Sequence, residues 1–267
     1  MNVLENRMIN ILKELKEKNG AIAVRAEFEA EGTRLDELFR LKEISVRAGL
    51  GLVLKIGGCE SIRDMLESRI VGVNCLVAPM VESAYALRKY LQAIKKVFTA
   101  QERKSIKISC NIETVTACQN LKEMLEIPEI SVLHGIVIGR VDLCFSSGKN
   151  EEYVNNKEIT KLVREAIAAA KKKNLVCMMG GGLSPESMEI FKDLSDGALD
   201  YCETRKVCFL YPKLLATDYK KGILKALGFE LLWLKNKATY YKGITDADKA
   251  RLSLIEQKYL NELDSLI

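Results

Sequence analysis

Ile108-Ser-Cys-Asn-Ile-Glu113 and Gly135-Ile-Val-Ile-Gly-Arg-Val-Asp142 are two short apolar runs, each with a carboxylate at its downstream end. Runs of this length that are rich in Ile and Val are typical of buried strands. The segment between them, 114–126, predicts a helix. A strand, a helix and a strand in this order form a right-handed crossover with parallel strands. We therefore expect Glu113 and Asp142 at the same edge of one sheet, on strands about 5 Å apart.

Two carboxylates placed this way either repel each other or share a cation. Hard cations such as Mg²⁺ and Mn²⁺ are commonly held by one or two carboxylates together with water and substrate oxygens. The spacing therefore makes Glu113 and Asp142 candidate metal ligands. The alternative is that both acids cap helices or pair with Arg and Lys side chains at loop tips.

The rest of the chain repeats the same alternation of strands and helices over roughly 200 residues. Such alternation favours a parallel α/β fold with both faces of the sheet covered. We predict a TIM-type (β/α) barrel, with a doubly wound open sheet as the competing architecture. Only seven strands are clear, so the first strand could lie in the N-terminal segment 2–18, which otherwise reads as a helix, or the barrel is atypical. The expected strands are 21–27, 50–56, 71–79, 107–113, 135–139, 175–179 and 198–202.

The C-terminal part of the chain lacks this alternation. We predict a barrel over residues 1–206 and a helical extension over residues 207–267, in which 246–266 form a separate amphipathic helix. This is more helix than a barrel needs to cover itself. We expect the extension to pack on the barrel or on a neighbouring subunit, and we predict a homo-oligomer.

Composition indicates an ordinary globular protein and excludes several classes of function. The 267 residues are 48% hydrophobic and 29% charged, and the formal charge is only +5. Lys and Arg alternate with Glu and Asp and are not interleaved with aromatic residues, so we expect no nucleic-acid partner. No apolar run is long enough to span a membrane, and residues 1–18 do not resemble a signal peptide. The eight cysteines show no metal-finger spacing and several lie in apolar runs, which predicts a cytoplasmic protein.

Polar residues follow nearly every predicted strand, at the edge where the active sites of parallel barrels lie. Carboxylates there can serve proton transfer, cations can hold an anionic substrate, and glycines allow the backbone to approach a ligand. The triple glycine 180–182 runs into a helix that Ser184 should cap. It could hold an anion on free N–H groups, or it could be a tight turn that needs positive φ. The further candidates at strand ends are Glu27, Glu29, Lys55, Arg140, Glu203 and Arg205.

Three motifs together resemble the HpcH/HpaI aldolase and citrate lyase β-subunit family. They are Ala-Pro-Met-Val-Glu-Ser (78–83), Asn-Ile-Glu-Thr (111–114) and Ile-Gly-Arg-Val-Asp-Leu-Cys-Phe-Ser-Ser-Gly (138–148). The family typically shows Pro-Met-Val-Glu-Thr, Ile-Glu-Thr and Gly-Pro-x-Asp-Leu-Ser-x-Ser-Leu-Gly in this order. The resemblance covers about residues 21–205.

The resemblance implies a barrel, a divalent cation (Mg²⁺ or Mn²⁺) on Glu113 and Asp142, and pyruvate or a related 2-oxo acid as substrate. It also implies that the backbone of the turn at Gly139, Arg140 and Val141 holds the carboxylate of the 2-oxo acid. C-terminal helices are often exchanged between subunits in this family, which suits the long helical extension.

The chain departs from the family pattern at several positions. Lys55 stands where the aldolases usually carry an Arg at the end of their third strand, and it lacks the bidentate fork of Arg. The His of the family's proton relay is missing, because His134 precedes a strand and so lies at the wrong edge. Glu27 or Glu29 occupies the region of that His and could act as a base. Arg140 replaces the Pro of Gly-Pro-x-Asp.

These observations support a metal-dependent carbon–carbon lyase of the class II aldolase type that acts through a pyruvate-like enolate. An aldehyde or acyl acceptor would be the second substrate, with Arg140, Arg205 and Gly181 near its acidic or phosphorylated end. One alternative is Schiff-base chemistry at Lys55, or a relative that uses phosphoenolpyruvate or acyl-CoA. Another is a non-catalytic protein that binds a 2-oxo acid or scaffolds a complex.

Overall fold

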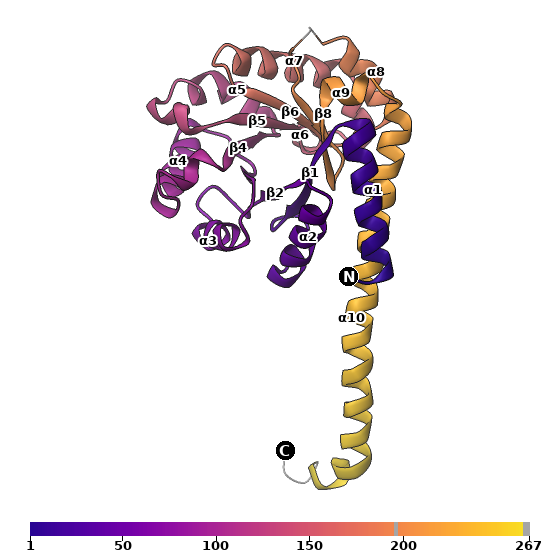
Figure 1. Cartoon of the computed structure of the whole chain (residues 1–267). Helices are drawn as coiled ribbons and strands as arrows, with labels where there is room; N and C mark the ends of the chain where they lie inside the picture. Colours follow the sequence, from indigo (N-terminus) through magenta and orange to yellow (C-terminus); the bar gives the residue numbers. More distant parts are fainter. Residues whose placement is uncertain (195–196, 264–267) are drawn as a thin grey trace.

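A computed structural model describes residues 1–194 and 197–263, with side chains described up to residue 257. Eight strands in the described residues form one closed barrel in sequence order, surrounded by helices (Figure 1). The prediction of a TIM-type barrel is therefore confirmed, and the alternative prediction of an open sheet is wrong. The strands are β1 (Ala21–Glu27), β2 (Gly51–Lys55), β3 (Cys75–Ala78), β4 (Lys107–Ile112), β5 (Gly135–Gly139), β6 (Val176–Gly180), β7 (Tyr201–Glu203) and β8 (Val207–Leu210).

The eighth strand makes the barrel atypical. Strands β1 to β7 are parallel in sequence order, whereas β8 runs antiparallel to both β7 and β1. It follows β7 through the turn 204–206, so β7 and β8 form a hairpin. Our prediction that the chain is only helical after residue 206 is wrong at β8. The predicted division of the chain at residue 206 itself stays a prediction.

Helices cover the barrel between its parallel strands, as the sequence pattern predicted. The segment 3–19 is a helix that ends at Gly20, whose φ of 73° is the left-handed conformation that favours glycine. It is not the missing strand. The helices are α1 (Val3–Asn19), α2 (Leu35–Arg47), α3 (Ile62–Val71), α4 (Ala84–Val97), α5 (Val115–Met124), α6 (Arg140–Ser146), α7 (Lys157–Lys171), α8 (Pro185–Lys192), α9 (Tyr211–Leu215) and α10 (Tyr219–Leu263).

The C-terminal helix α10 is continuous over its 45 residues. Our prediction of a separate helix over 246–266 is therefore wrong, and residues 264–266 of it lie outside the described residues. The first half of α10 packs along α1, where Phe229 and Trp233 are buried. The second half projects away from the barrel (Figure 1). Among the described residues, no helix combines the length and the hydrophobicity that a membrane span requires.

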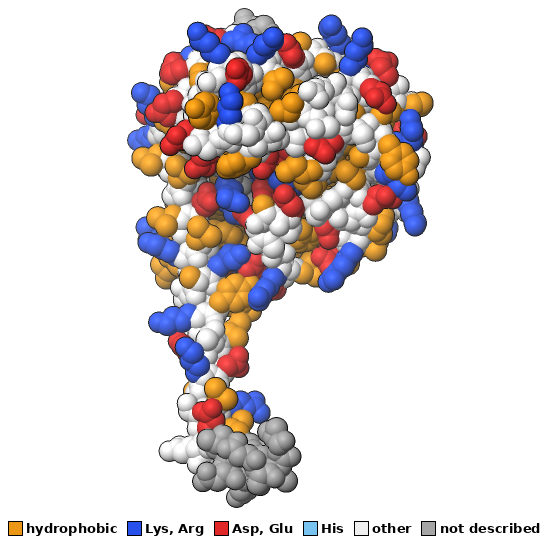
Figure 2. All heavy atoms as spheres, turned by 180° about the vertical axis from the view of Figure 1, so that it is seen from behind, with side chains coloured by type: hydrophobic (Ala, Val, Ile, Leu, Met, Phe, Trp, Pro, Cys, Tyr) orange, Lys and Arg blue, Asp and Glu red, His pale blue; other side chains and the backbone are white. Residues whose placement is uncertain are grey.

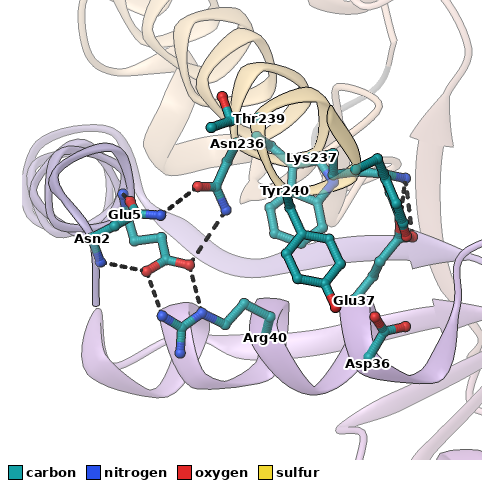
Figure 3. Close-up of a pocket in the computed structure, with 11 residues that line it drawn as sticks. Asn2, Glu5, Asp36, Glu37, Arg40, Asn236, Lys237, Thr239 and Tyr240 are labelled. Carbon is teal, nitrogen blue, oxygen red and sulfur yellow. Dashed lines mark hydrogen bonds and ion pairs between the residues drawn. The ribbon is translucent and has the colours of Figure 1, made fainter. Parts of the chain in front are cut away.

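Polar contacts fix α10 where it leaves α1 (Figure 3). Asn2 donates to Asn236 over 2.7 Å, and Arg40 of α2 donates to Glu5 of α1 over 2.5 Å. Lys237 and Tyr241 of α10 both contact Glu37, in the first turn of α2. This turn follows the carboxyl end of β1, so α10 passes the carboxyl edge of the parallel strands before it projects into solvent.

Candidate functional site

The carboxyl edge of the parallel strands holds a cavity of about 380 Å³. Side chains and glycines from the ends of β1, β2, β4, β5, β6 and β7 line it, because parallel strands of a barrel present their βα loops at this edge. All but one of the site residues that we predicted line this single cavity. They are Glu27, Glu29, Lys55, Glu113, Gly139, Val141, Asp142, Gly181 and Arg205.

Glu113 is held on both carboxylate oxygens. Its Oε1 accepts from the backbone N–H of Met80 over 2.9 Å, and its Oε2 accepts from the Asn111 amide over 2.6 Å. The side chain is 1% exposed, and burial raises the pKa of Glu113, an effect that Lys55 partly offsets. A Cβ at Gly139 would lie 2.5 Å from Oε2, so only glycine leaves room for this carboxylate.

Lys55 lies between two carboxylates at the end of β2. Its ammonium is 2.8 Å from Glu29 and 4.0 Å from Glu113, and the side chain is buried. Burial opposes the charged form, but Glu113 and Glu29 outweigh it and raise the pKa of Lys55. The amine is thus held as an ammonium, whereas a Schiff base requires a neutral amine at the moment of attack. These surroundings favour Lys55 as a fixed positive charge.

A second buried group of charges lies beside the first. The Arg25 guanidinium is 3.1 Å from Glu27 and 2.9 Å from Glu203. Burial raises the pKa of Glu203, and Arg25 counteracts this only in part. The Cys208 thiol, on the antiparallel strand β8, also donates to Glu203 over 3.3 Å. Glu27 and Glu203 are therefore fixed in orientation by one shared cation.

The structure does not bring the Arg140 side chain to the cavity. Its guanidinium is buried in the loop before α8, where it donates to the carbonyl oxygens of Gly180, Val154 and Gly182 and to the side chains of Asn155 and Ser187. It also lies over the Phe191 ring, 4.7 Å from the centroid. Burial lowers the pKa of Arg140 to about 10. A role for this guanidinium in holding an acidic substrate group therefore does not fit its position.

The triple glycine forms a tight turn beside the start of α6. Gly181 and Gly182 have φ values of 73° and 67°, which is the reason for glycine at both positions. A Cβ at Gly181 would lie 2.7 Å from the amide nitrogens of Arg140 and Val141. Glycine at this position thus avoids a clash with these two nitrogens, and a role for them in binding a carboxylate stays a prediction. Ser184 caps α8 as expected, accepting from the Ser187 N–H.

The residues at this edge fit a hard cation. The carboxylates of Glu113 and Asp142 line the same cavity, and the buried Oδ1 of Asn111 beside them has no hydrogen-bond partner. Carboxylate and amide oxygens are the ligands that Mg²⁺ and Mn²⁺ prefer. No group of three or more His, Cys, Asp or Glu side chains in the described part of the chain could hold a metal. Glu113 and Asp142 could therefore be only part of a coordination shell that water or substrate completes.

Sequence reasoning missed several residues of the cavity, and the two polar ones on strands are Arg25 and Asn111. Each precedes a predicted site residue by two positions on a strand, Arg25 before Glu27 and Asn111 before Glu113. Side chains two apart on a strand point to the same face, so this spacing could have identified both. His134 precedes β5 and lies at the opposite edge of the barrel, as expected.

Part of the barrel sequence matches the model of a known protein family. Residues 54–184, just under half of the chain, match the sequence model of HpcH/HpaI aldolase/citrate lyase. This stretch of the chain is similar to the HpcH/HpaI aldolases and citrate lyases. This confirms the resemblance that the motifs indicated, and it supports an enzyme of the aldolase or citrate lyase type. No match was found among curated protein sequences.

Several solved structures share the fold, and two of them are of HpcH/HpaI proteins. An HpcH/HpaI aldolase from Desulfitobacterium hafniense DCB-2 is 14% identical, with 72% of this chain and 79% of that chain covered and a TM-score of 0.58. A family protein from Burkholderia cenocepacia J2315 is 9% identical, with 69% and 88% covered and a TM-score of 0.54. The citrate synthase SbnG is 13% identical, with 85% and 98% covered and a TM-score of 0.59. At these identities the likeness concerns the fold alone.

Proposed function

We propose that this HpcH/HpaI family barrel is a divalent-metal-dependent carbon–carbon lyase that forms or consumes the enolate of pyruvate or a related 2-oxo acid. The observation that carries the proposal is the convergence of Glu113, Asp142 and Lys55 on one cavity at the carboxyl edge. An enolate is an oxyanion, and fixed positive charge beside it is the main way in which such a site accelerates its formation.

Glu113 and Asp142 would hold Mg²⁺ or Mn²⁺. The metal, when bound, supplies positive charge next to the oxygen on which the enolate's negative charge develops. Met80 and Asn111 keep the Glu113 carboxylate in one orientation through the two hydrogen bonds described above. A preorganised carboxylate does not have to reorient during the reaction, which lowers the barrier.

Lys55 would add a second positive charge at the enolate. Its contacts with Glu29 and Glu113 keep it charged, so we favour this role over Schiff-base chemistry. Borohydride treatment in the presence of pyruvate distinguishes the two roles. We expect no adduct at Lys55, whereas a trapped adduct would favour the Schiff base.

Glu27 and Glu29 are the candidates for proton transfer, in place of the family's His. Glu27 is paired with Arg25, and Glu29 is paired with Lys55 beside the proposed enolate position. We favour Glu29, because its side chain is 29% exposed and can exchange protons with solvent, whereas that of Glu27 is 5% exposed. Replacing Glu29 with Gln should then slow the exchange of pyruvate methyl protons in D₂O more than replacing Glu27 does. The reverse order would assign the transfer to Glu27.

The test of the proposal is oxaloacetate decarboxylation by protein treated with a chelator, with and without added Mg²⁺ or Mn²⁺. This reaction passes through the pyruvate enolate and needs no acceptor, so the unknown second substrate does not matter. We expect metal-dependent activity that Glu113→Gln abolishes. Glu67→Gln is the matched control, because this carboxylate lies on the outer helix α3 in an exposed pair with Arg63.

Two outcomes would overturn the proposal. Full activity of Glu113→Gln would exclude the metal role of this carboxylate. Metal binding without any decarboxylation would favour the alternative that the barrel only binds a 2-oxo acid, or that it uses phosphoenolpyruvate or an acyl-CoA.

We also propose that the chain forms a homo-oligomer through α10. Leu224, Leu227, Leu231 and Leu234 are each about half exposed or more, and their spacing of three and four residues is that of a coiled-coil seam. Hydrophobic side chains also occur among charged ones on the projecting part of α10 (Figure 2). Light scattering of the wild type should give more than one subunit, and Leu227→Asp with Leu231→Asp should reduce the mass. A monomeric wild type would contradict the proposal.

A further inference from the structure

The loop that joins β1 to α2, residues 28–34, carries Glu29, the group that we favour for proton transfer. We call this segment the β1–α2 loop. Backbone hydrogen bonds hold its two ends, because the N–H groups of Phe28 and Thr33 donate to the carbonyl oxygens that end β2 and β1, over 2.8 and 3.2 Å. Between these two residues the described part of the chain makes no backbone–backbone hydrogen bond. Residues 29–32 therefore depend on their side chains for a fixed position.

Each carboxylate of the β1–α2 loop is paired with a buried cation. Glu29 pairs with Lys55 over 2.8 Å, and Glu31 pairs with Lys206. Lys206 belongs to the turn between β7 and β8, and only 3% of its side chain is exposed. Arg205 of the same turn lies 3.4 Å from Glu31, but 55% of its side chain is exposed. The contact with Lys206 is therefore the buried one of the two and is the one less screened by solvent.

The barrel holds Lys206 in place beneath this loop. Its carbonyl oxygen accepts from the N–H of Arg25 over 3.0 Å, which ties the turn between β7 and β8 to β1. Burial lowers the pKa of this lysine, and the carboxylates of Glu31, Glu27 and Glu230 oppose the effect. Among the described residues that line the cavity, neither Lys206 nor Glu31 is found. The pair can therefore influence the reaction only through the loop that it holds.

We propose that Lys206 is a positioning residue for proton transfer, which holds the β1–α2 loop through Glu31 so that Glu29 stays beside Lys55. The inference rests on the proposed function, with Glu29 as its base. In the proton-transfer step, the Glu29 carboxylate takes up a proton of the pyruvate methyl group, and the electron pair of the broken C–H bond moves into the enolate. Loss of the pair between Lys206 and Glu31 frees the loop, so the carboxylate is less often within reach of that proton.

Two reactions of the metal-loaded full chain separate positioning from general stability. Exchange of pyruvate methyl protons in D₂O needs a base that removes a proton, whereas oxaloacetate decarboxylation produces the enolate by loss of CO₂ and needs none. Lys206→Met keeps an apolar stem in the buried site and removes the charge. We expect it to slow exchange at saturating pyruvate at least about tenfold and to leave decarboxylation within about twofold of the wild type. Lys18→Met is the matched control and should change neither rate, because this lysine lies in an exposed pair with Glu14.

A double substitution keeps the test valid if the single variant folds poorly. Lys206→Met leaves the Glu31 carboxylate without its buried partner, which is destabilising, whereas Lys206→Met combined with Glu31→Gln removes both charges. In denaturant titrations the double variant should be more stable than Lys206→Met, yet its exchange should stay slow, because the loop is still detached. Recovery of exchange together with stability would overturn the inference, since Lys206 would then serve the fold alone.

The remaining outcomes distinguish a failure of this inference from a failure of the proposed function. Wild-type exchange in Lys206→Met, or an equal loss of exchange and decarboxylation in the double variant, would overturn only the inference. A wild type that decarboxylates oxaloacetate without exchanging the protons of pyruvate would also overturn only the inference, because no base would be acting. Absence of both reactions in the wild type would refute the proposed function, and the inference with it.

Discussion

Substituting Gly139 with Ala should disable the site by moving one carboxylate. A Cβ at this position would lie 2.5 Å from Glu113 Oε2 and 2.8 Å from Glu113 Cβ, whereas ordinary contacts begin at 3.4 Å. The overlap with the carboxylate oxygen is thus about 0.9 Å. Glu113 cannot move by this amount without stretching its hydrogen bonds to Met80 and Asn111, which hold both of its oxygens.

A displacement of this size has two expected effects. A shift of about 1 Å in a catalytic group typically costs about 10²-fold in rate, so kcat for oxaloacetate decarboxylation should fall by about that factor. Overpacking of a buried site costs about 1–3 kcal/mol, so the free energy of unfolding should decrease by that amount. The assays are decarboxylation at saturating Mg²⁺ and chemical denaturation of the same preparation.

Gly228→Ala is the matched control. It is the same substitution inside helix α10, at a glycine where a new Cβ would have no atom within 4 Å. This variant should keep full activity and gain about 0.5–1 kcal/mol of stability, because alanine is the better helix former. If Gly139→Ala kept the wild-type kcat, the placement of Glu113 against this glycine would have no role in the reaction.

Three further substitutions or conditions test the packing around the site. Arg140→Met should lower the free energy of unfolding by about 3 kcal/mol, because the buried carbonyl oxygens of Gly180 and Gly182 lose a donor. The control Arg63→Met, at an exposed side chain, should change the free energy of unfolding little. Equal effects of the two substitutions in denaturant titrations would contradict this prediction. Phe229→Ala should cost about 3–5 kcal/mol, since this ring of α10 is fully buried. A loss below about 1 kcal/mol in the same titration would show that α10 packs differently. The pKa of Glu37 is lowered, because the hydrogen bonds from Tyr241 and Lys237 outweigh the opposing effect of burial. The ionised carboxylate therefore stabilises the fold at neutral pH, and this contribution is lost as the pH falls below 4.5, the ordinary pKa of a Glu side chain. Fluorescence of Trp233, which lines the same junction, should report this loss in the wild type and a smaller one in Glu37→Gln; identical acid transitions would exclude Glu37 as the cause.

The sequence predicted most of the barrel because its strands are short, apolar and separated by helices. Glu113 and Asp142 could be assigned to one edge, since parallel strands joined by helices all end there, and both line the same cavity. Strand β8 could not be recognised in this way. It has only four residues, and the preceding turn, Thr204 to Lys206, contains none of the Gly, Pro, Asn or Asp residues that mark hairpins.

The sequence also did not predict the direction in which long side chains point. Arg140 begins a helix directly after a strand, and whether its guanidinium turns into the cavity or away from it depends on the carbonyl groups that the neighbouring loop offers. These carbonyls come from residues about forty positions later, Gly180 and Gly182. Lys55 was recognised as a departure from the family, but its pairing with Glu29 depends on a loop conformation that no spacing rule determines.

The antiparallel strand that completes the barrel has a consequence for how the chain folds during synthesis. Strand β1 cannot find its second neighbour until residues 207–210 have left the ribosome, because Ala21 pairs with Phe209. Until then β1 and β7 are open edges, which are prone to pair with other chains. Contacts between such distant segments also form slowly. The nascent protein therefore stays vulnerable to aggregation for most of its synthesis, and C-terminal truncation before residue 207 should yield insoluble protein rather than a smaller barrel.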